Sequence, residues 1–194
     1  MMAEALVLQL LQSVAGVPRL YGVTDSPPQA LVMTHCPGEQ LEAFHTPRTA
    51  RTFLASLQRA SRILLRMHAL GVSHGDVHQR NILVQAAGDT EQVTVHLVDF
   101  EESQIFNDER EKRLDALNLF NIARSYVLEI NKHLYPGLHR RRHRLLQQQD
   151  ASLDLSRVSV LLCNILHGCP CPDQPTSSLL PCRACSASED SRES

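Results

Sequence analysis

The hydrophobic positions of the chain follow helical spacing over several long stretches. Apolar residues recur three or four positions apart over residues 3–14, 48–69 and 112–131, and residues 155–167 form a further apolar segment. Such spacing places the apolar side chains on one face of a helix. We therefore expect three amphipathic helices in this order, with a fourth apolar element after them.

Four shorter apolar runs have the composition of strands. "VPRLYGVT" and "QALVMTHC" are separated by the turn signal "DSPP", so they form a hairpin or adjacent strands. "NILVQ" and "VTVHLVDF" are separated by "AAGDT", which predicts a second hairpin. No internal repeat is present.

Composition and charge exclude several classes of protein. The chain has 194 residues, 43% of them hydrophobic, which suits one domain or one large lobe with a tail. Its net charge of −2 favours neither nucleic acid nor an anionic membrane as a partner. No apolar run reaches the roughly 18 residues of a membrane-spanning helix. The start lacks a basic region typical of signal peptides, and four of the six cysteines crowd into the last 30 residues, so we expect a reducing, cytoplasmic location.

The stretch "VSHGDVHQRNILV" concentrates polar groups directly before a predicted strand. Asn81 follows Asp76 at a spacing that lets one tight loop present a carboxylate and an amide oxygen together. Asp99 ends the strand of "HLVDF", so it and Asn81 provide the hard oxygen ligands that Mg²⁺ prefers. Asp76 is then free to orient or deprotonate a hydroxyl. This set of groups is what phosphoryl transfer requires.

These two motifs resemble the catalytic loop and the metal-binding D-F-G of the protein-kinase-like superfamily. The resemblance implies an α+β fold with a partial N-lobe over 1–36 and a mainly helical C-lobe over 37–167. The composition of 168–194 predicts a Pro/Ser/Cys-rich, disordered tail. It also implies ATP and Mg²⁺ as cofactors. The roles it implies are Asp76 as base, His74 as the brace of the loop, and Asn81 and Asp99 as Mg²⁺ ligands, with Glu101 as a further metal contact.

The order of the upstream segments agrees with this resemblance. Residues 3–14 resemble the C-helix of kinases, with Glu4 as its ion-pair glutamate. "ALVMTHCPGEQL" resembles a strand and hinge, with Met33 at the gatekeeper position and Thr34 to Cys36 offering backbone groups to adenine. Leu83 would lie under the adenine ring. Asp115, in "LDALNLFNIA", resembles the helix-borne Asp that braces the catalytic loop.

Departures from the protein-kinase pattern leave the acceptor open. Gly75 replaces the Arg of H-R-D, and Glu101 replaces the Gly of D-F-G. The resulting pair of motifs, H-G-D and D-F-E, is similar to that of aminoglycoside phosphotransferases and choline/ethanolamine kinases. About 14 residues separate Phe100 from Asp115, and A-P-E is absent. Arg80, immediately before Asn81, instead resembles the tyrosine-kinase pattern, which would give it a catalytic role, and the alternative is that it pairs with a surface acid. The hydroxyl acceptor is therefore either a small molecule or a protein Ser, Thr or Tyr.

No Gly-rich loop and no strand Lys precede Glu4 in the sequence. These elements cover and grip the nucleotide phosphates in kinases. Three explanations stay open: an active phosphotransferase that dispenses with them, a catalytically inactive pseudokinase that acts as a binding scaffold, and a fragment of a longer chain.

Three further features admit simple alternatives. Cys169, Cys171, Cys182 and Cys185 have a spacing that would close a zinc site, although a disordered tail explains them better. The basic cluster between Arg140 and Arg144 is more typical of a solvated helix face than of a phosphate-binding patch. His78 resembles the position at which many protein kinases carry a phosphate-contacting Lys, and its role is open.

Overall fold

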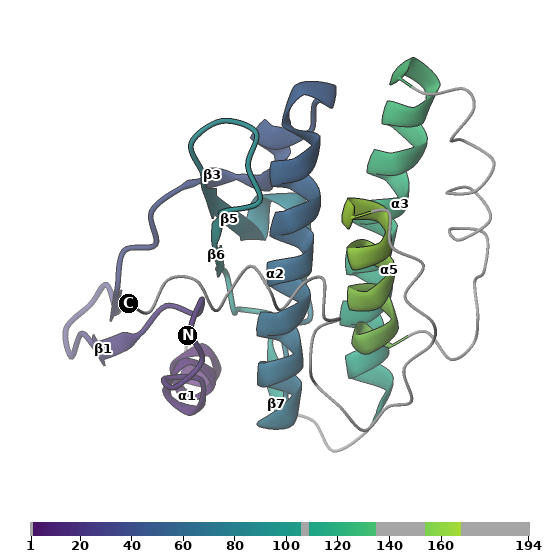
Figure 1. Ribbon diagram of the computed structural model, residues 1–194. Coiled ribbons are helices and arrows are strands. Elements are labelled where there is room, and N and C mark those ends of the chain that lie inside the picture. The colour runs from purple at the N-terminus through teal and green to yellow at the C-terminus, as the bar shows by residue number, and fades with distance from the viewer. Residues whose placement is uncertain (1, 106–108, 135–153, 168–194) are drawn as a thin grey trace, which may run out of the picture.

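The computed structural model describes residues 2–105, 109–134 and 154–167 (Figure 1). Its α-helices are α1 (Met2–Leu10), α2 (Ala50–Ala69), α3 (Glu109–Leu134) and α5 (Leu155–His167). Its strands are β1 (Leu20–Val23), β2 (Leu31–Met33), β3 (Glu39–Gln40), β4 (Val72–Ser73), β5 (Ile82–Gln85), β6 (Thr94–Leu97) and β7 (Gln104–Ile105). Three 3₁₀ turns complete the described elements: η1 (Leu41–Phe44), η2 (Pro47–Thr49) and η3 (Gln79–Asn81).

The described strands form three small antiparallel sheets. β1 pairs with β2, β5 lies between β3 and β6, and β4 pairs with β7. The β4–β7 pair joins Val72 to Ile105 and Ser73 to Gln104, so it brackets the candidate catalytic loop with the segment that follows the second motif. The sheets therefore bring the two motifs to one place.

Helix α2 is the centre of the fold. It packs against α3 and α5 on one side and against the β5–β6 hairpin on the other (Figure 1). Helices α2, α3 and α5 run side by side, and α1 lies with the β1–β2 hairpin at the other end of the molecule (Figure 1). The largest fully buried side chains come from α1, η1, α2, α3, the β5–β6 hairpin and the segments next to them: Tyr126, Phe53, Phe100, Phe120, Leu8, Leu11, Leu41, Leu57, Leu64, Met67, Ile82 and Leu97.

A carboxylate from the β5–β6 turn caps the start of α2. Asp89 Oδ1 accepts hydrogen bonds from the backbone N–H groups of Arg51 (2.9 Å) and Thr52 (3.1 Å). The first N–H groups of a helix have no partner within the helix, so an acceptor at this point stabilises it. The hydroxyl of Thr52 in turn bonds Gly88 O and Thr90 O. The hairpin and the central helix are thus fastened to one another.

The α+β, kinase-like class expected from the sequence is confirmed, as are the predicted helices and the two hairpins. The two-residue strands β3, β4 and β7 were not predicted, because a run that short carries no alternation of apolar and polar residues. The C-terminal cysteines and the basic cluster lie outside the described residues. None of the described helices is long and apolar enough to cross a bilayer.

Candidate active site

A buried carboxylate on α3 holds the loop that carries the candidate base. Asp115 is fully buried, and its Oδ2 accepts hydrogen bonds from the backbone N–H of His74 (2.8 Å) and from Nε2 of His68 (2.8 Å). Its Oδ1 accepts from the backbone N–H of Gly75 (3.0 Å). A buried carboxylate is stable only when its oxygens are paired in this way. The loop is therefore fixed to the helical core immediately before Asp76.

His74 is a neutral, buried brace between the two motifs. Its Nε2 lies 3.1 Å from the carbonyl oxygen of Val98 and donates to it, while its Nδ1 accepts from the backbone N–H of Asp76 at 3.4 Å. The ring packs against Phe100 with centroids 5.0 Å apart. Burial lowers the pKa of His74, and the nearby carboxylate of Asp115 opposes this effect. His74 thus joins the candidate catalytic loop to the segment after β6 that contains Asp99.

The side chains of Asp76 and Asn81 meet within the loop. Asn81 Nδ2 donates to the Asp76 backbone oxygen at 3.1 Å and to Asp76 Oδ2 at 3.2 Å. Asn81 is buried, whereas the Asp76 side chain is 45% exposed and open to a substrate. Because the amide nitrogen of Asn81 is used by Asp76, its Oδ1 is left as the group that faces other ligands.

The backbone conformation at position 75 explains why this loop has Gly75 where H-R-D has an Arg. Its φ is +82°, in the region that L residues rarely adopt, and a Cβ there would lie against the carbonyl oxygen of Glu102. The loop and the segment after "DFE" therefore pass too closely for any side chain at position 75. Ser103 adds to this contact by donating its hydroxyl to the His74 carbonyl oxygen at 2.9 Å.

Three carboxylates gather at the second motif. Asp99 has a φ of +66°, a strained conformation for a non-glycine residue, and its side chain is exposed, as is that of Glu101. Glu4 on α1 is close enough for the charges of both carboxylates to act on its own carboxyl group. Burial raises the pKa of Glu4, and the charges of Asp99 and Glu101 raise it further. This concentration of negative charge favours a cation.

The donor set fits Mg²⁺ held together with nucleotide phosphates. Mg²⁺ takes oxygen ligands and is usually bound through one or two carboxylates, water and phosphate oxygens. The backbone N–H of Val98 donates to Asn81 O at 3.0 Å, so the start of the second motif lies beside Asn81. Within the described ranges, no three His, Cys, Asp or Glu side chains are grouped as a metal site of their own. The protein groups would therefore be Asn81 Oδ1 and Asp99, with Glu101 near them.

The residues expected to contact adenine lie at the end of β2 and on β5. The backbone N–H of Thr34 is already bonded to Arg19 O at 2.9 Å, and its hydroxyl accepts from Arg19 N at 2.6 Å. Met33, Cys36 and Leu83 are half-buried, and burial raises the pKa of the Cys36 thiol. Gln40 of β3 pairs with Leu83 of β5, so the chain that follows Cys36 runs antiparallel beside the strand that carries Leu83.

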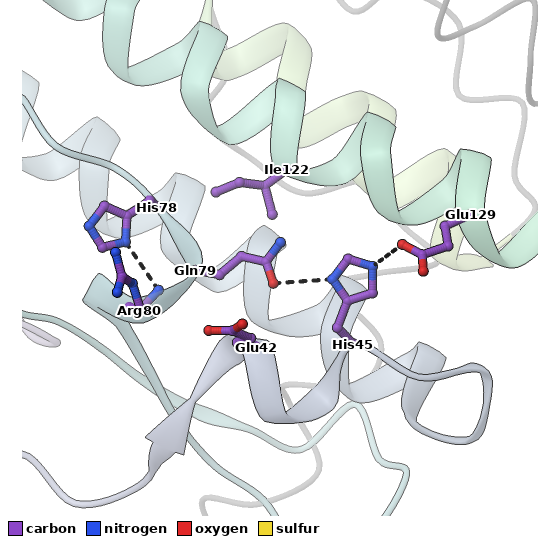
Figure 2. Close-up of a pocket in the computed structure, with 7 residues that line it drawn as sticks. All are labelled: Glu42, His45, His78, Gln79, Arg80, Ile122 and Glu129. Carbon is purple, nitrogen blue, oxygen red and sulfur yellow. Dashed lines mark hydrogen bonds and ion pairs between the residues drawn. The ribbon is translucent and has the colours of Figure 1, made fainter.

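A polar cavity of about 610 Å³ opens beside the catalytic loop, between η1 and α3 (Figure 2). Its lining residues are Glu42, His45, His78, Gln79, Arg80, Ile122 and Glu129. His45 spans it, since its Nδ1 lies 3.2 Å from Gln79 Oε1 and its Nε2 lies 3.0 Å from Glu129 Oε2 (Figure 2). The predicted site residue Arg80 is exposed in this lining.

The sequence did not reveal the partners that come from distant segments. His68 bonds Asp115 across 47 residues, and His45 meets Gln79 across 34. Neither pair has a short motif that would reveal it. The one available signal was that His68 falls in the last turn of an otherwise apolar helix stripe, where a charged or polar side chain needs a partner.

The chain was compared with models of known protein families and with curated proteins. The model of a family described as "Lipopolysaccharide kinase (Kdo/WaaP) family" matches residues 39–148, which is more than half of the chain. The matched span contains Asp76, Asn81, Asp99 and Asp115 but not α1, β1 or β2. Among curated proteins, none matches the chain.

Proposed function

Because the chain belongs to the lipopolysaccharide kinase (Kdo/WaaP) family, we propose that it is an ATP- and Mg²⁺-dependent phosphotransferase that phosphorylates a hydroxyl group, with Asp76 as its base. The observation that carries this proposal is the geometry of Asp76. Its Oδ2 is held by Asn81, its backbone is held through His74 and Gly75 by Asp115, and its side chain still reaches solvent.

The proposed reaction needs little covalent chemistry from the protein. The acceptor oxygen forms a bond to the γ-phosphorus as the bond from that phosphorus to the bridging oxygen of ADP breaks. The hydroxyl proton passes to Oδ1 of Asp76, the carboxylate oxygen that Asn81 does not engage. Mg²⁺, when bound, neutralises charge on the phosphates. Asn81 and Asp99 are the residues proposed to hold it, with Glu101 beside them.

The polar cavity of Figure 2 lies beside the loop that carries Asp76, which supports binding of an acceptor there. His78 lines this cavity and lies 3.2 Å from Asp76 Oδ2, so an acceptor in the cavity would be close to the base. The lining offers both donors and acceptors: the guanidinium of Arg80, the amide of Gln79 and the carboxylate of Glu42. Such a lining suits a polar, hydroxyl-rich acceptor such as a sugar.

A transfer assay with radiolabelled ATP tests this proposal. The protein is incubated with Mg²⁺ and [γ-³²P]ATP and with lipopolysaccharide, free hexoses or a mixture of Ser, Thr and Tyr peptides. We expect label in at least one acceptor, and we expect Asp76→Ala to lower the rate by about 10²–10⁴-fold because the general base is lost. Equal rates in the two proteins would show that Asp76 is not the base. Asp89→Ala, which alters only the cap of α2, is the matched control.

A further inference from the structure

The imidazole of His78 bridges two parts of the catalytic loop. Its Nε2 lies 3.2 Å from Oδ2 of Asp76, and its Nδ1 accepts a hydrogen bond from the backbone N–H of Arg80 at 3.2 Å (Figure 2 shows the second contact). His78 is in extended backbone conformation at the start of η3, with φ −147° and ψ 169°. Its side chain therefore turns back over the loop that contains the proposed base.

The backbone contact decides which nitrogen carries the proton. An amide N–H can only donate, so Nδ1 of His78 has to be the unprotonated nitrogen. In the neutral ring the proton is then on Nε2, which faces Asp76 and donates to its Oδ2. The turn at Arg80 thus fixes the tautomer that the carboxylate requires.

Both contacts to the carboxylate of Asp76 fall on the same oxygen. Oδ2 accepts from His78 Nε2 and from Asn81 Nδ2, each at 3.2 Å. Among the described residues, no interaction of Oδ1 accompanies these two. Two donors on one oxygen fix the rotation of the carboxylate and leave the other oxygen facing outward.

We propose that His78 is a positioning residue for the base: it holds the carboxylate of Asp76 so that Oδ1 faces the acceptor hydroxyl. This inference rests on the phosphotransferase function proposed above. It also answers the question that the sequence left open at this position. A phosphate-contacting role would need a free ring nitrogen, whereas both nitrogens of His78 already have partners.

Two substitutions of matched size separate this role from the alternatives. His78→Gln places an amide nitrogen the same number of bonds from Cβ as Nε2, so it can still donate to Asp76. His78→Leu fills similar space without a donor. We expect His78→Leu to lower kcat about 10-fold or more, with KM for ATP within about twofold of wild type, because a misdirected base slows the chemical step but not binding. His78→Gln should recover kcat to within about threefold of wild type.

Several outcomes would overturn the proposal. Wild-type kcat in His78→Leu removes the positioning role, and an effect confined to KM for ATP indicates a phosphate contact instead. Nitrogen chemical shifts of the wild-type ring give a test that does not depend on whether a variant folds: protonation at Nε2 supports the proposal, and protonation at Nδ1 contradicts it. A wild-type protein that labels no acceptor at all overturns the phosphotransferase function, and this role with it.

Discussion

His74 shows how one buried side chain connects the two motifs. It bonds Val98 through one nitrogen and Asp76 through the other, and its ring packs on Phe100. A ring that uses one nitrogen as donor and the other as acceptor has to be neutral. The lowered pKa of His74, caused mainly by burial, agrees with this state. The geometry of the site therefore depends on keeping this imidazole uncharged.

We expect the stability of the protein to fall as the pH drops below about 6.5, the ordinary pKa of His. There the unfolded chain takes up a proton that folded His74 resists, so acid favours unfolding. Urea unfolding between pH 7.5 and 5.5 gives the free energy of unfolding as a function of pH. His74→Gln should reduce the slope of this dependence, and it should lower the free energy of unfolding at pH 7.5 by about 1–3 kcal/mol through lost hydrogen bonds. The same substitution at exposed His35 is the control. An unchanged slope in His74→Gln would count against a neutral brace.

Helix α3 acts on the site through Asp115. Its buried carboxylate receives two backbone N–H groups of the loop and the ring of His68 from α2. Two helices and the catalytic loop thus converge on one side chain. The position of Asp76, the proposed base, is therefore set by the packing of α2 against α3, and not by the loop alone.

Asp115→Asn should destabilise the protein by about 2–4 kcal/mol, because one oxygen becomes an NH₂ group that faces buried donors. Urea unfolding measures the loss. Asp89→Asn is the matched control: it changes the same group at the exposed cap of α2, where Asn is an equally good acceptor, so at most a few tenths of a kcal/mol is expected. If Asp115→Asn were no more costly than Asp89→Asn, the carboxylate would not be the anchor of the loop.

At the scale of the whole molecule, the sequence predicted what lies within single segments. Asp76 and Asn81 share one loop, so their spacing alone placed them together, and the apolar periodicity located α2 and α3. The cavity that joins η1, the loop and α3 could not be predicted, since His45 and Glu129 meet only after α2 and α3 have packed. The need for Gly75 likewise became clear only from its contact with Glu102.

The two halves of the molecule supply different parts of the proposed site. Asp76, Asn81 and Asp99 lie on segments next to the β5–β6 hairpin that packs against α2, while Glu4 on α1 senses the charges of Asp99 and Glu101. Gly16 O accepts from Leu97 N at 2.8 Å and fastens the two halves next to the second motif. Among the described residues, the carboxylate of Asp76 contacts Asn81 and His78 and not Asp99, so the proposed base and this proposed cation ligand can be substituted separately.

The most direct test of the account is a crossed measurement of transfer and binding. Single-turnover transfer from [γ-³²P]ATP and Mg²⁺-dependent ATP affinity are measured for wild type, Asp76→Asn and Asp99→Asn. The account predicts that Asp76→Asn loses about 10²-fold or more in transfer rate while its ATP affinity stays within about threefold of wild type. It predicts that Asp99→Asn loses the Mg²⁺-dependent part of that affinity. Wild-type transfer by Asp76→Asn, or Mg²⁺-dependent ATP binding that is unchanged in Asp99→Asn, would contradict the assignment of base and cation site.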